Sequence, residues 1–363
     1  MKKKSILFVV DKPDWAYEFM VKSWLPYLLK EYDCYIAYQQ DFTIKLRKSN
    51  KFFRYFYNLK SLFISKINTS KTTYFLHKNY IYKHYNRPPF YKFTSIIGDK
   101  ILEKNSPEIF DFKIEMAFYF QYTSKIPFIA KKNVTGIFTD CFPHEGPTYD
   151  IKSGTDRSLL RREQFYEKYL KPYDHIIVGG GNLLQDYQKL TKKVSFVYGI
   201  YGETLFQQNP SVGDTPGLTV GWTGNPNRPM KGFQQFIEPS IENLKAKGFD
   251  IKLKTKFSGN YEELYSFYKD VDLIVIASSA DSGPSLFAEA ALSAVPTIST
   301  KVGLPLMGII DGENGLFVER NIKSIEKAII DLYDNREKLK QFSSRIKTDY
   351  LTTLETKHSV GNL

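Results

Sequence analysis

The sequence predicts an α/β protein made of two doubly wound domains that face a cleft. Its 363 residues are too many for one hydrophobic core of ordinary size. In both halves, short β-branched apolar runs alternate with amphipathic stretches, a pattern typical of parallel sheets covered by helices. Residues 199–217 are rich in Gly, Pro and Gln and separate the halves as a linker. Ligands of such sheets bind beyond the carboxyl ends of the strands.

The first half opens with a β-α-β pattern. Ser5–Val10 predicts a buried strand, Trp15–Lys30 a helix with apolar residues at helical spacing, and Cys34–Tyr38 a second strand. Residues 41–95 have weak periodicity, so we expect helices and loops of an elaborated surface there. The remaining elements expected in this half are strands at Lys113–Ala117, Val134–Thr139, His175–Val178 and Val194–Tyr198, and a helix at Leu159–Tyr169.

The second half repeats the alternation over a shorter length. Its expected strands are Leu218–Trp222, Asp250–Lys256, Asp272–Ile276 and Thr297–Thr300, and its expected helices are Phe233–Lys247, Tyr261–Lys269, Leu286–Ser293, Ile322–Tyr333 and Glu337–Tyr350. We therefore expect an N-terminal Rossmann-like domain over residues 1–200 and a C-terminal one over 201–345. Residues 346–363 form a tail that can pack back on the N-terminal domain.

Composition narrows the compartment and the class of protein. The two cysteines, Cys34 and Cys141, lie far apart, which excludes a disulfide framework and a cysteine metal site and suits a reducing cytoplasm. The apolar run after Met1 ends within about six residues, too short for an export signal. No run of about 18 apolar residues occurs, so no membrane span is expected.

Positive charge is concentrated in one segment. The net charge is +12, and residues 41–104 hold 14 Lys and Arg against three acids, interleaved with Tyr and Phe. Such a surface attracts anionic lipid heads or an acidic acceptor, which places the protein in the cytoplasm and peripherally on the inner face of a membrane. A solvated lysine-rich face is the plain alternative, and nucleic acid is the least favoured partner.

Two carboxylates, Asp281 and Glu289, flank a turn that comes after the strand Asp272–Ile276. Ser285 is a plausible N-cap for the next helix, which leaves free backbone N–H groups near Leu286 and Phe287. Such a helix start holds phosphate because its unpaired donors and its dipole both favour anions. We expect Glu289 to reach ribose hydroxyls and Asp281 to reach a sugar. The segment Gly283, Pro284, Ser285, Leu286 and Phe287 would cradle the phosphates.

This motif resembles the retaining GT-B glycosyltransferases often numbered family 4. Their signature is an acid, seven residues and then Glu, which the segment DSGPSLFAE from Asp281 to Glu289 matches in spacing. Pro296, Gly303 and the segment DGENGLFV that starts at Asp311 fit the positions further along the family's pattern. Here the first acid is Asp instead of Glu, and Ser282 replaces the usual Gly. The resemblance covers the C-terminal half well and the N-terminal half in outline.

The resemblance implies a cation in the loop after the first strand of the second domain. A fixed cation stabilises the negative charge that grows on a leaving nucleoside diphosphate. Lys231 matches the family's Lys, Trp222 stands where an Arg is usual, and Arg228 is an inferred substitute. Gly224 and Asn225, in the same loop, are further expected donor contacts. Asp270 and Asp272 have the letters of a metal motif but precede a strand, so we expect no metal.

Loops of the first domain supply the candidate acceptor contacts. Trp15 lies in the loop after the first strand, and Asp140, His144 and Glu145 come after the strand Val134–Thr139. We expect His144 to take part in catalysis together with Asp281 and Lys231, although a loop histidine with a purely structural role is equally compatible. Retention without a clear enzymatic nucleophile is usually explained by front-face attack, in which the donor phosphate serves as the base.

The sequence therefore predicts a hexosyltransferase-type, metal-independent, retaining glycosyltransferase that needs no cofactor. Its substrates would be a UDP- or GDP-linked sugar and a glycan or lipid-linked acceptor of surface polysaccharide or glycoconjugate synthesis. Two alternatives stay open. One is a nucleotide-sugar epimerase or phosphorylase on the same fold, and the other is a non-catalytic protein of this fold that binds nucleic acid or membrane through residues 41–104.

Overall fold

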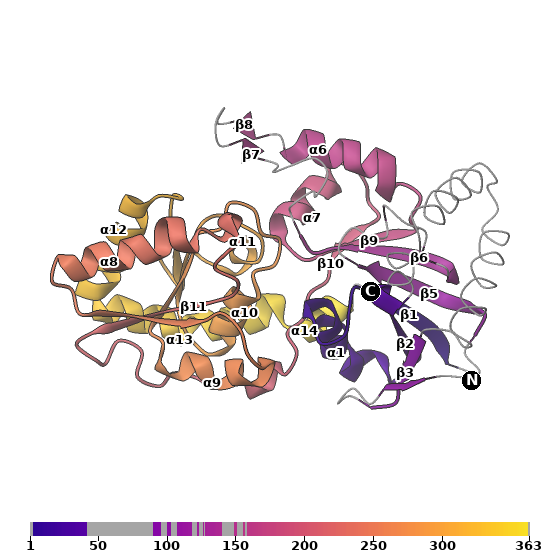
Figure 1. Ribbon diagram of the computed structural model, residues 1–363, viewed down its shortest axis with the longest axis horizontal. Helices are drawn as coiled ribbons and strands as arrows, with labels where there is room; N and C mark the ends of the chain where they lie inside the picture. The colour runs from indigo at the N-terminus through magenta and orange to yellow at the C-terminus, as the bar shows by residue number, and fades with distance from the viewer. Residues whose placement is uncertain are drawn as a thin grey trace, which may run out of the picture. The chain divides into compact units, whose positions relative to one another are not determined.

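The computed structural model describes residues 3–41, 90–95, 100–102, 107–117, 122, 126, 128–139, 149–150, 155–156 and 158–361 (Figure 1). The chain divides into two compact units. Unit 1 comprises residues 1–137 and 167–177, and unit 2 comprises residues 138–166 and 178–363. Most of the basic segment 41–104 lies outside the described residues, so its expected role stays a prediction.

The first sheet has eight strands in the order β10-β9-β6-β5-β1-β2-β3-β4. β1 pairs in parallel with β2 and β5, and β5 in parallel with β6. The strands are β1 (Lys4–Val10), β2 (Tyr32–Tyr38), β3 (Phe90–Phe93), β4 (Lys100–Leu102), β5 (Ile109–Met116), β6 (Ile129–Ile137), β9 (His175–Val178) and β10 (Val194–Phe196). β1 runs through the middle because its apolar run is buried on both faces.

One expectation for this sheet is wrong. Phe90–Phe93 was expected within a stretch of helices and loops, but it forms strand β3, antiparallel to β2. The reason is packing: Phe90 lies in a buried cluster with Tyr35, Phe110 and Phe128, and aromatic rings in such a cluster favour a pleated backbone. Four residues are too few to show this periodicity in the sequence.

Helix α1 (Ala16–Leu28) contacts β1 and β2, and helix α7 (Gly181–Gln188) contacts β10. Helix α6 (Ser158–Phe165), which continues as a π-helical turn over Tyr166–Leu170, contacts α7. A separate two-stranded ribbon joins β7 (Tyr149–Asp150) and β8 (Thr155–Asp156). Helix α1, α6 with its π-helical turn, and strand β9 all lie where the sequence predicts them.

The second sheet is fully parallel, in the order β12-β11-β13-β14-β15. Its strands are β11 (Leu218–Thr223), β12 (Ile251–Lys256), β13 (Leu273–Ile276), β14 (Thr297–Ser299) and β15 (Gly315–Phe317). Helices α8 (Glu238–Ala246) and α12 (Ile322–Asp334) lie together on one face of this sheet, and α9 (Leu264–Phe267) and α10 (Ser285–Leu292) lie on the other (Figure 1). The doubly wound second domain is therefore confirmed.

The segment between β12 and β13 is less regular than expected. Instead of one helix over Tyr261–Lys269, it forms a 3₁₀ turn at Tyr261–Glu263, one turn of α-helix in α9, and a second 3₁₀ turn at Tyr268–Asp270. The tighter winding brings Tyr268 fully into the interior, where its ring meets Phe267 and Phe206.

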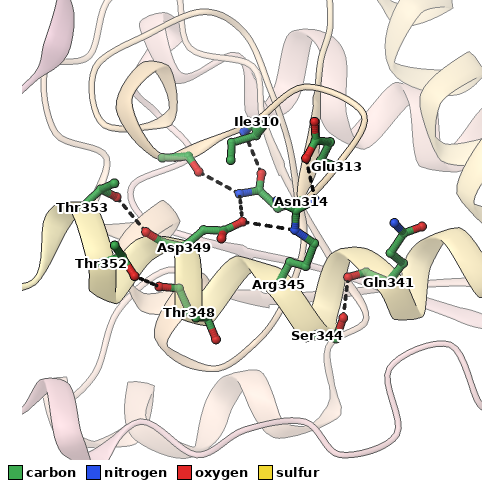
Figure 2. A network of polar contacts seen from close by, with 11 residues as sticks. Ile310, Glu313, Asn314, Gln341, Ser344, Arg345, Thr348, Asp349, Thr352 and Thr353 are labelled. Atoms are coloured by element: carbon green, nitrogen blue, oxygen red, sulfur yellow. Dashed lines mark hydrogen bonds and ion pairs between the residues drawn. The ribbon is translucent and has the colours of Figure 1, made fainter.

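The last helices brace this unit. α11 (Pro305–Gly308) and α10 both pack on the long helix α13 (Arg336–Leu354). The buried amide of Asn314 joins the loop before β15 to α13: it accepts from the Ile310 backbone (2.8 Å) and donates to Gly308 O (3.1 Å) and Asp349 Oδ2 (2.9 Å) (Figure 2). Arg345 adds an ion pair with Glu313 (2.5 Å) from the same helix (Figure 2).

The chain's tail also packs within unit 2. After α13, α14 (Thr356–Val360) presents Ser359 Oγ to the Tyr198 backbone N–H (2.5 Å) and Thr356 Oγ to the Ile200 N–H (3.3 Å). The tail thereby fixes the start of the segment 199–217 that leads into β11. No helix among the described residues is long and apolar enough to cross a membrane.

Candidate functional site

Lys231 and Asp281 form an ion pair at the carboxyl ends of β11 and β13. Lys231 ends a 3₁₀ turn after β11, and Asp281 stands in the loop between β13 and α10. Both side chains are mostly buried, at 22% and 11% exposure, and Ser278 Oγ also contacts Asp281 Oδ2 (3.4 Å). A cation and a carboxylate thus share one small site where parallel sheets bind their ligands.

Backbone contacts hold these two loops against each other. The Ser279 N–H donates to Met230 O (2.8 Å), which ties the residue before Lys231 to the loop of Asp281. Gly232 has φ +70°, and a Cβ there would lie 2.4 Å from Ala277 O. Only glycine fits that approach. The loops can close on each other because β11 and β13 are neighbours in the sheet.

The helix start after Asp281 differs in detail from its prediction. Ser285 is not the N-cap: α10 begins at Ser285, and Pro284 is the N-cap, with its carbonyl accepting the Phe287 N–H (2.9 Å). Proline has no N–H to satisfy, so it ends the turn readily at this position. The Phe287 amide is therefore not free, contrary to expectation, and the side chains of Leu286 and Phe287 are buried in the core.

Glu289 lies one turn into α10 and is 2% exposed. Its Oε2 accepts a hydrogen bond from Tyr268 Oη (2.6 Å), and the Ser285 side chain bonds to it as well. Burial raises the pKa of Glu289, while the hydroxyls of Tyr268 and Ser285 and the charge of Lys231 act to lower this pKa. Such a carboxylate can accept hydrogen bonds from the hydroxyls of a bound ligand.

Tyrosines surround this carboxylate. Burial is the main cause that raises the pKa of Tyr198, Tyr261 and Tyr268, and the negative charge of Glu289 raises it further in each. All three phenols therefore stay protonated at neutral pH and can donate hydrogen bonds. Tyr198 Oη points to Gly283 O (3.5 Å), which connects these phenols to the turn after Asp281.

The start of α7 packs against the same turn, backbone to backbone. The Gly181 N–H donates to Gly303 O (3.2 Å). A Cβ at Gly180 would lie 1.8 Å from Ser282 O, a position that no side chain could occupy without moving the turn. The segment 179–181 thus belongs to the wall of the site within unit 2.

The other expected donor contacts are spread along the loop after β11. Asn225 Oδ1 accepts the Asn227 N–H (2.9 Å) and closes a turn just after Gly224. Arg228 is exposed, and its guanidinium contacts the sulfur of Met230 (3.3 Å), while Lys231 is the cation that meets Asp281. Trp222, at the position where the family usually has Arg, is buried against Phe233 (ring centroids 4.5 Å apart).

The candidate acceptor residues are only partly described. Asp140, His144 and Glu145 lie outside the described residues, so their roles stay predictions. Trp15 is half exposed and precedes α1, with the Lys12 ammonium 3.7 Å from its ring centroid. In the same loop Asp11 is buried, which raises its pKa to about 6.

The Asp270–Asp272 pair has a structural environment. Asp272 is buried and accepts the backbone N–H groups of Gly213 (3.2 Å) and Thr219 (2.8 Å), while Asp270 pairs with Lys254 (3.4 Å) at the surface. Both carboxylates thus have protein partners. Within the part of the chain that is described, no group of three His, Cys, Asp or Glu could hold a metal ion.

Sequence reasoning missed two residues of this site. Tyr268 hydrogen-bonds to Glu289, and a signal for it exists in the sequence: Tyr261, Tyr265 and Tyr268 recur at the i, i+4, i+7 spacing of one helix face. Arg320, which contacts both loops of the ion pair, had no signal, because no sequence pattern links it to positions 43 and 91 residues earlier.

Comparison with known families gives a match to part of the chain. Residues 239–349 match the family "Glycosyl transferases group 1". This segment includes Asp281 and Glu289 but not Lys231. A search of curated protein sequences finds no match.

Solved structures of the same fold extend over the whole chain. TarM superposes with a TM-score of 0.59 at 13% identity, over 99% of this chain and 98% of that one. Anabaena HepE in complex with UDP-glucose gives 0.57 at 12% identity, over 98% and 97%. A point mutant of S. aureus TarM, in complex with Fondaparinux, alpha-GlcNAc-glycerol and UDP, gives 0.52 at 14% identity, over 75% of this chain and 60% of that one.

The fold is therefore that of the GT-B glycosyltransferases, as the sequence predicts. Within its second half, residues 239–349 are similar to the glycosyl transferases group 1 family.

Proposed function

We propose that this protein is a retaining glycosyltransferase that moves a sugar from a nucleotide-sugar to a glycan or lipid-linked acceptor. The observation that carries this is the ion pair of Lys231 and Asp281 beside the buried Glu289, at the carboxyl edge of a parallel sheet. The site combines a cation for a diphosphate, a helix start of matching polarity, and two carboxylates for hydroxyl groups. We propose residues 201–345 as the donor-binding domain.

Each group has a separate task in this proposal. Lys231 moves from Asp281 to the β-phosphate and stabilises its growing charge, which is the usual source of catalysis for such leaving groups. Glu289 accepts hydrogen bonds from the ribose, and Asp281, once released by Lys231, accepts them from the sugar. Gly283, Pro284 and Ser285 line the phosphates, and the acceptor binds through Trp15, Asp140, His144 and Glu145.

The transfer step balances without an enzymatic nucleophile. The bond between the anomeric carbon and the β-phosphate oxygen breaks, and the acceptor oxygen bonds to the same face of that carbon. The acceptor proton passes to the departing phosphate oxygen, so a nucleoside diphosphate leaves and no cofactor is consumed.

UDP is the first nucleotide to test, because TarM and HepE structures hold UDP or UDP-glucose. Melting curves with UDP, GDP, CMP and ADP identify the donor class, since a ligand that binds only the native state raises Tm by mass action. Donor turnover is then compared between the wild type, Lys231→Ala and Glu289→Ala. We expect each variant to lose at least about tenfold, or about 1.4 kcal/mol of barrier. Unchanged turnover in both variants would refute the proposal, and release of a free epimer would favour an epimerase.

A further inference from the structure

Arg320 contacts both loops that form the Lys231–Asp281 ion pair. It stands between β15 and α12, far from either loop in sequence. Its Nε donates to Ala277 O (2.9 Å) and its Nη2 to Pro229 O (3.0 Å). Its guanidinium lies 4.5 Å from the ring centroid of Phe236, which supports the side chain from one face.

Each of the two carbonyls that Arg320 binds belongs to one of the two loops. Pro229 begins the 3₁₀ turn that ends at Lys231, and its carbonyl also accepts the Gly232 N–H (3.1 Å). Ala277 is the first residue after β13, and its carbonyl lies against Gly232. Arg320 therefore joins the two loops through their backbones, two residues before Lys231 and four residues before Asp281.

The charge of Arg320 has no acidic partner among the described residues. Arg162 and Arg345 pair with Asp186 and Glu313, whereas the guanidinium of Arg320 donates to neutral carbonyls. A half-buried cation without a compensating acid makes the adjoining loops favourable for an anion. The planar guanidinium also donates in fixed directions, so it can hold two carbonyls in one geometry, which a lysine ammonium cannot.

We propose that Arg320 is a positioning residue of the donor site. It holds the loop of Lys231 against the loop of Asp281, so that the ammonium can pass from Asp281 to the diphosphate of the donor without a rearrangement of the loops. This inference rests on the proposed function. It adds a determinant of diphosphate affinity that lies outside both donor loops.

The test compares Arg320→Met with Arg336→Met. Arg336 is a matched control, because it also donates Nη2 to a proline carbonyl (Pro216, 2.8 Å) and lies over an aromatic ring (Tyr333, 4.7 Å), but it stands outside both donor loops. Calorimetry compares the affinity for UDP with that for uridine, and the affinity for GDP with that for guanosine. We expect Arg320→Met to lower the affinity for whichever diphosphate binds the wild type by at least about tenfold. The affinity for the corresponding nucleoside should fall by less than about twofold. Arg336→Met should change neither affinity, and melting temperatures detect any general loss of stability.

A double-mutant cycle shows whether Arg320 acts through Lys231. In the Lys231→Ala background, Arg320→Met should cost less than about twofold in diphosphate affinity. Arg320→Lys keeps the charge but cannot hold both carbonyls in the same geometry. Its diphosphate affinity should therefore be almost as low as that of Arg320→Met. Full recovery in Arg320→Lys, a tenfold loss that persists without Lys231, or an equal loss of nucleoside affinity would each overturn the positioning role.

The two proposals fail in different ways. If the wild type binds none of UDP, GDP, CMP and ADP, the proposed function fails and this inference fails with it. If the wild type binds one of them and Arg320→Met binds it equally well, only the inference fails.

Discussion

Lys231 and Asp281 neutralise each other across 50 residues of sequence. Under the proposed function each also binds the donor, Lys231 its diphosphate and Asp281 its sugar. The pair keeps two mostly buried charges satisfied, which avoids the cost of leaving either alone. In that proposal donor binding exchanges one ion pair for another.

Asp281→Asn should separate the two uses of this pair. Removing the carboxylate frees Lys231, so UDP or GDP without a sugar should bind more tightly, by about fivefold for an exchange worth about 1 kcal/mol. Sugar transfer should fall at the same time, because the sugar loses its carboxylate partner. Calorimetry and a transfer assay measure both effects. Asp270→Asn, which breaks the surface pair with Lys254, is the control that should change neither. Weaker nucleotide binding in Asp281→Asn would contradict the exchange.

Tyr268→Phe should change the pH dependence of the reaction. Burial raises the pKa of Glu289, and the Tyr268 hydrogen bond counteracts that rise by favouring the carboxylate. Without the hydroxyl the pKa of Glu289 rises further, so the fall of kcat/KM on the acid side moves to higher pH. At pH 7 the loss of a charge-assisted hydrogen bond should lower kcat/KM by about tenfold.

Tyr265→Phe is the matched control for Tyr268→Phe. It lies on the same helical segment, and its hydroxyl donates to Tyr201 O (3.4 Å) instead. Its kcat/KM should fall at low pH over the same pH range as that of the wild type, which is the acid limb of the pH profile. An acid limb in Tyr268→Phe that coincides with both would show that Tyr268 does not tune Glu289.

The sequence predicted the features that depend on local pattern. Periodicity located most strands, though not β3, β4 or β15, and most helices, and the spacing of Asp281 and Glu289 placed both acids around a helix start. Ser285 was assigned as N-cap because its hydroxyl suits that position, but Pro284 occupies it and Ser285 turns towards Glu289 instead. A one-residue shift of this kind is below the precision that side-chain preference can reach.

The missing parts depend on tertiary structure. The contact of Lys231 with Asp281 arises because β11 and β13 are neighbours, although β12 lies between them in sequence. Arg320 enters the site only because β15 ends at the same edge of the sheet. Neither relationship leaves a periodic signal, so both required the strand order.

Asn314→Ala should destabilise the second domain without changing any residue that is proposed to bind the donor. The change removes three hydrogen bonds: the one to Gly308 O is buried, and those with the Ile310 N–H and Asp349 are partly buried (Figure 2). Unpaired buried groups cost about 1–3 kcal/mol each, so a total loss of about 3 kcal/mol is expected, or about 6–12 °C in Tm. Calorimetric melting measures it. Asn321→Ala, which removes only the exposed N-cap bond to Ser324, should cost about 1 kcal/mol. Equal effects of the two variants would show that the Asn314 network adds little.

Asp11→Asn should stabilise the protein at neutral pH and not in acid. Burial is the main cause that raises the pKa of Asp11 from 3.8 to about 6, and among the described residues its Oδ2 has no hydrogen-bond partner. The folded state therefore holds the proton more tightly than the unfolded chain. Its contribution to stability is complete below about pH 4 and is lost as pH rises through about 6. Asparagine stays neutral and keeps an oxygen for the Lys12 N–H (3.0 Å).

The free energy of unfolding of Asp11→Asn should therefore rise relative to the wild type between about pH 4 and pH 7, by up to about 3 kcal/mol. Its Tm should rise relative to the wild type over the same range. Asp111→Asn provides a control of opposite sign. The Lys131 hydrogen bond is the main cause that lowers the pKa of Asp111, so its carboxylate stabilises the fold above the unfolded pKa. That variant should be less stable than the wild type at pH 7, and the difference should shrink as pH falls below the unfolded pKa of about 3.8. Parallel pH profiles of wild type and Asp11→Asn would show that Asp11 is ionised at little cost, and that its loop is open to solvent or to a cation.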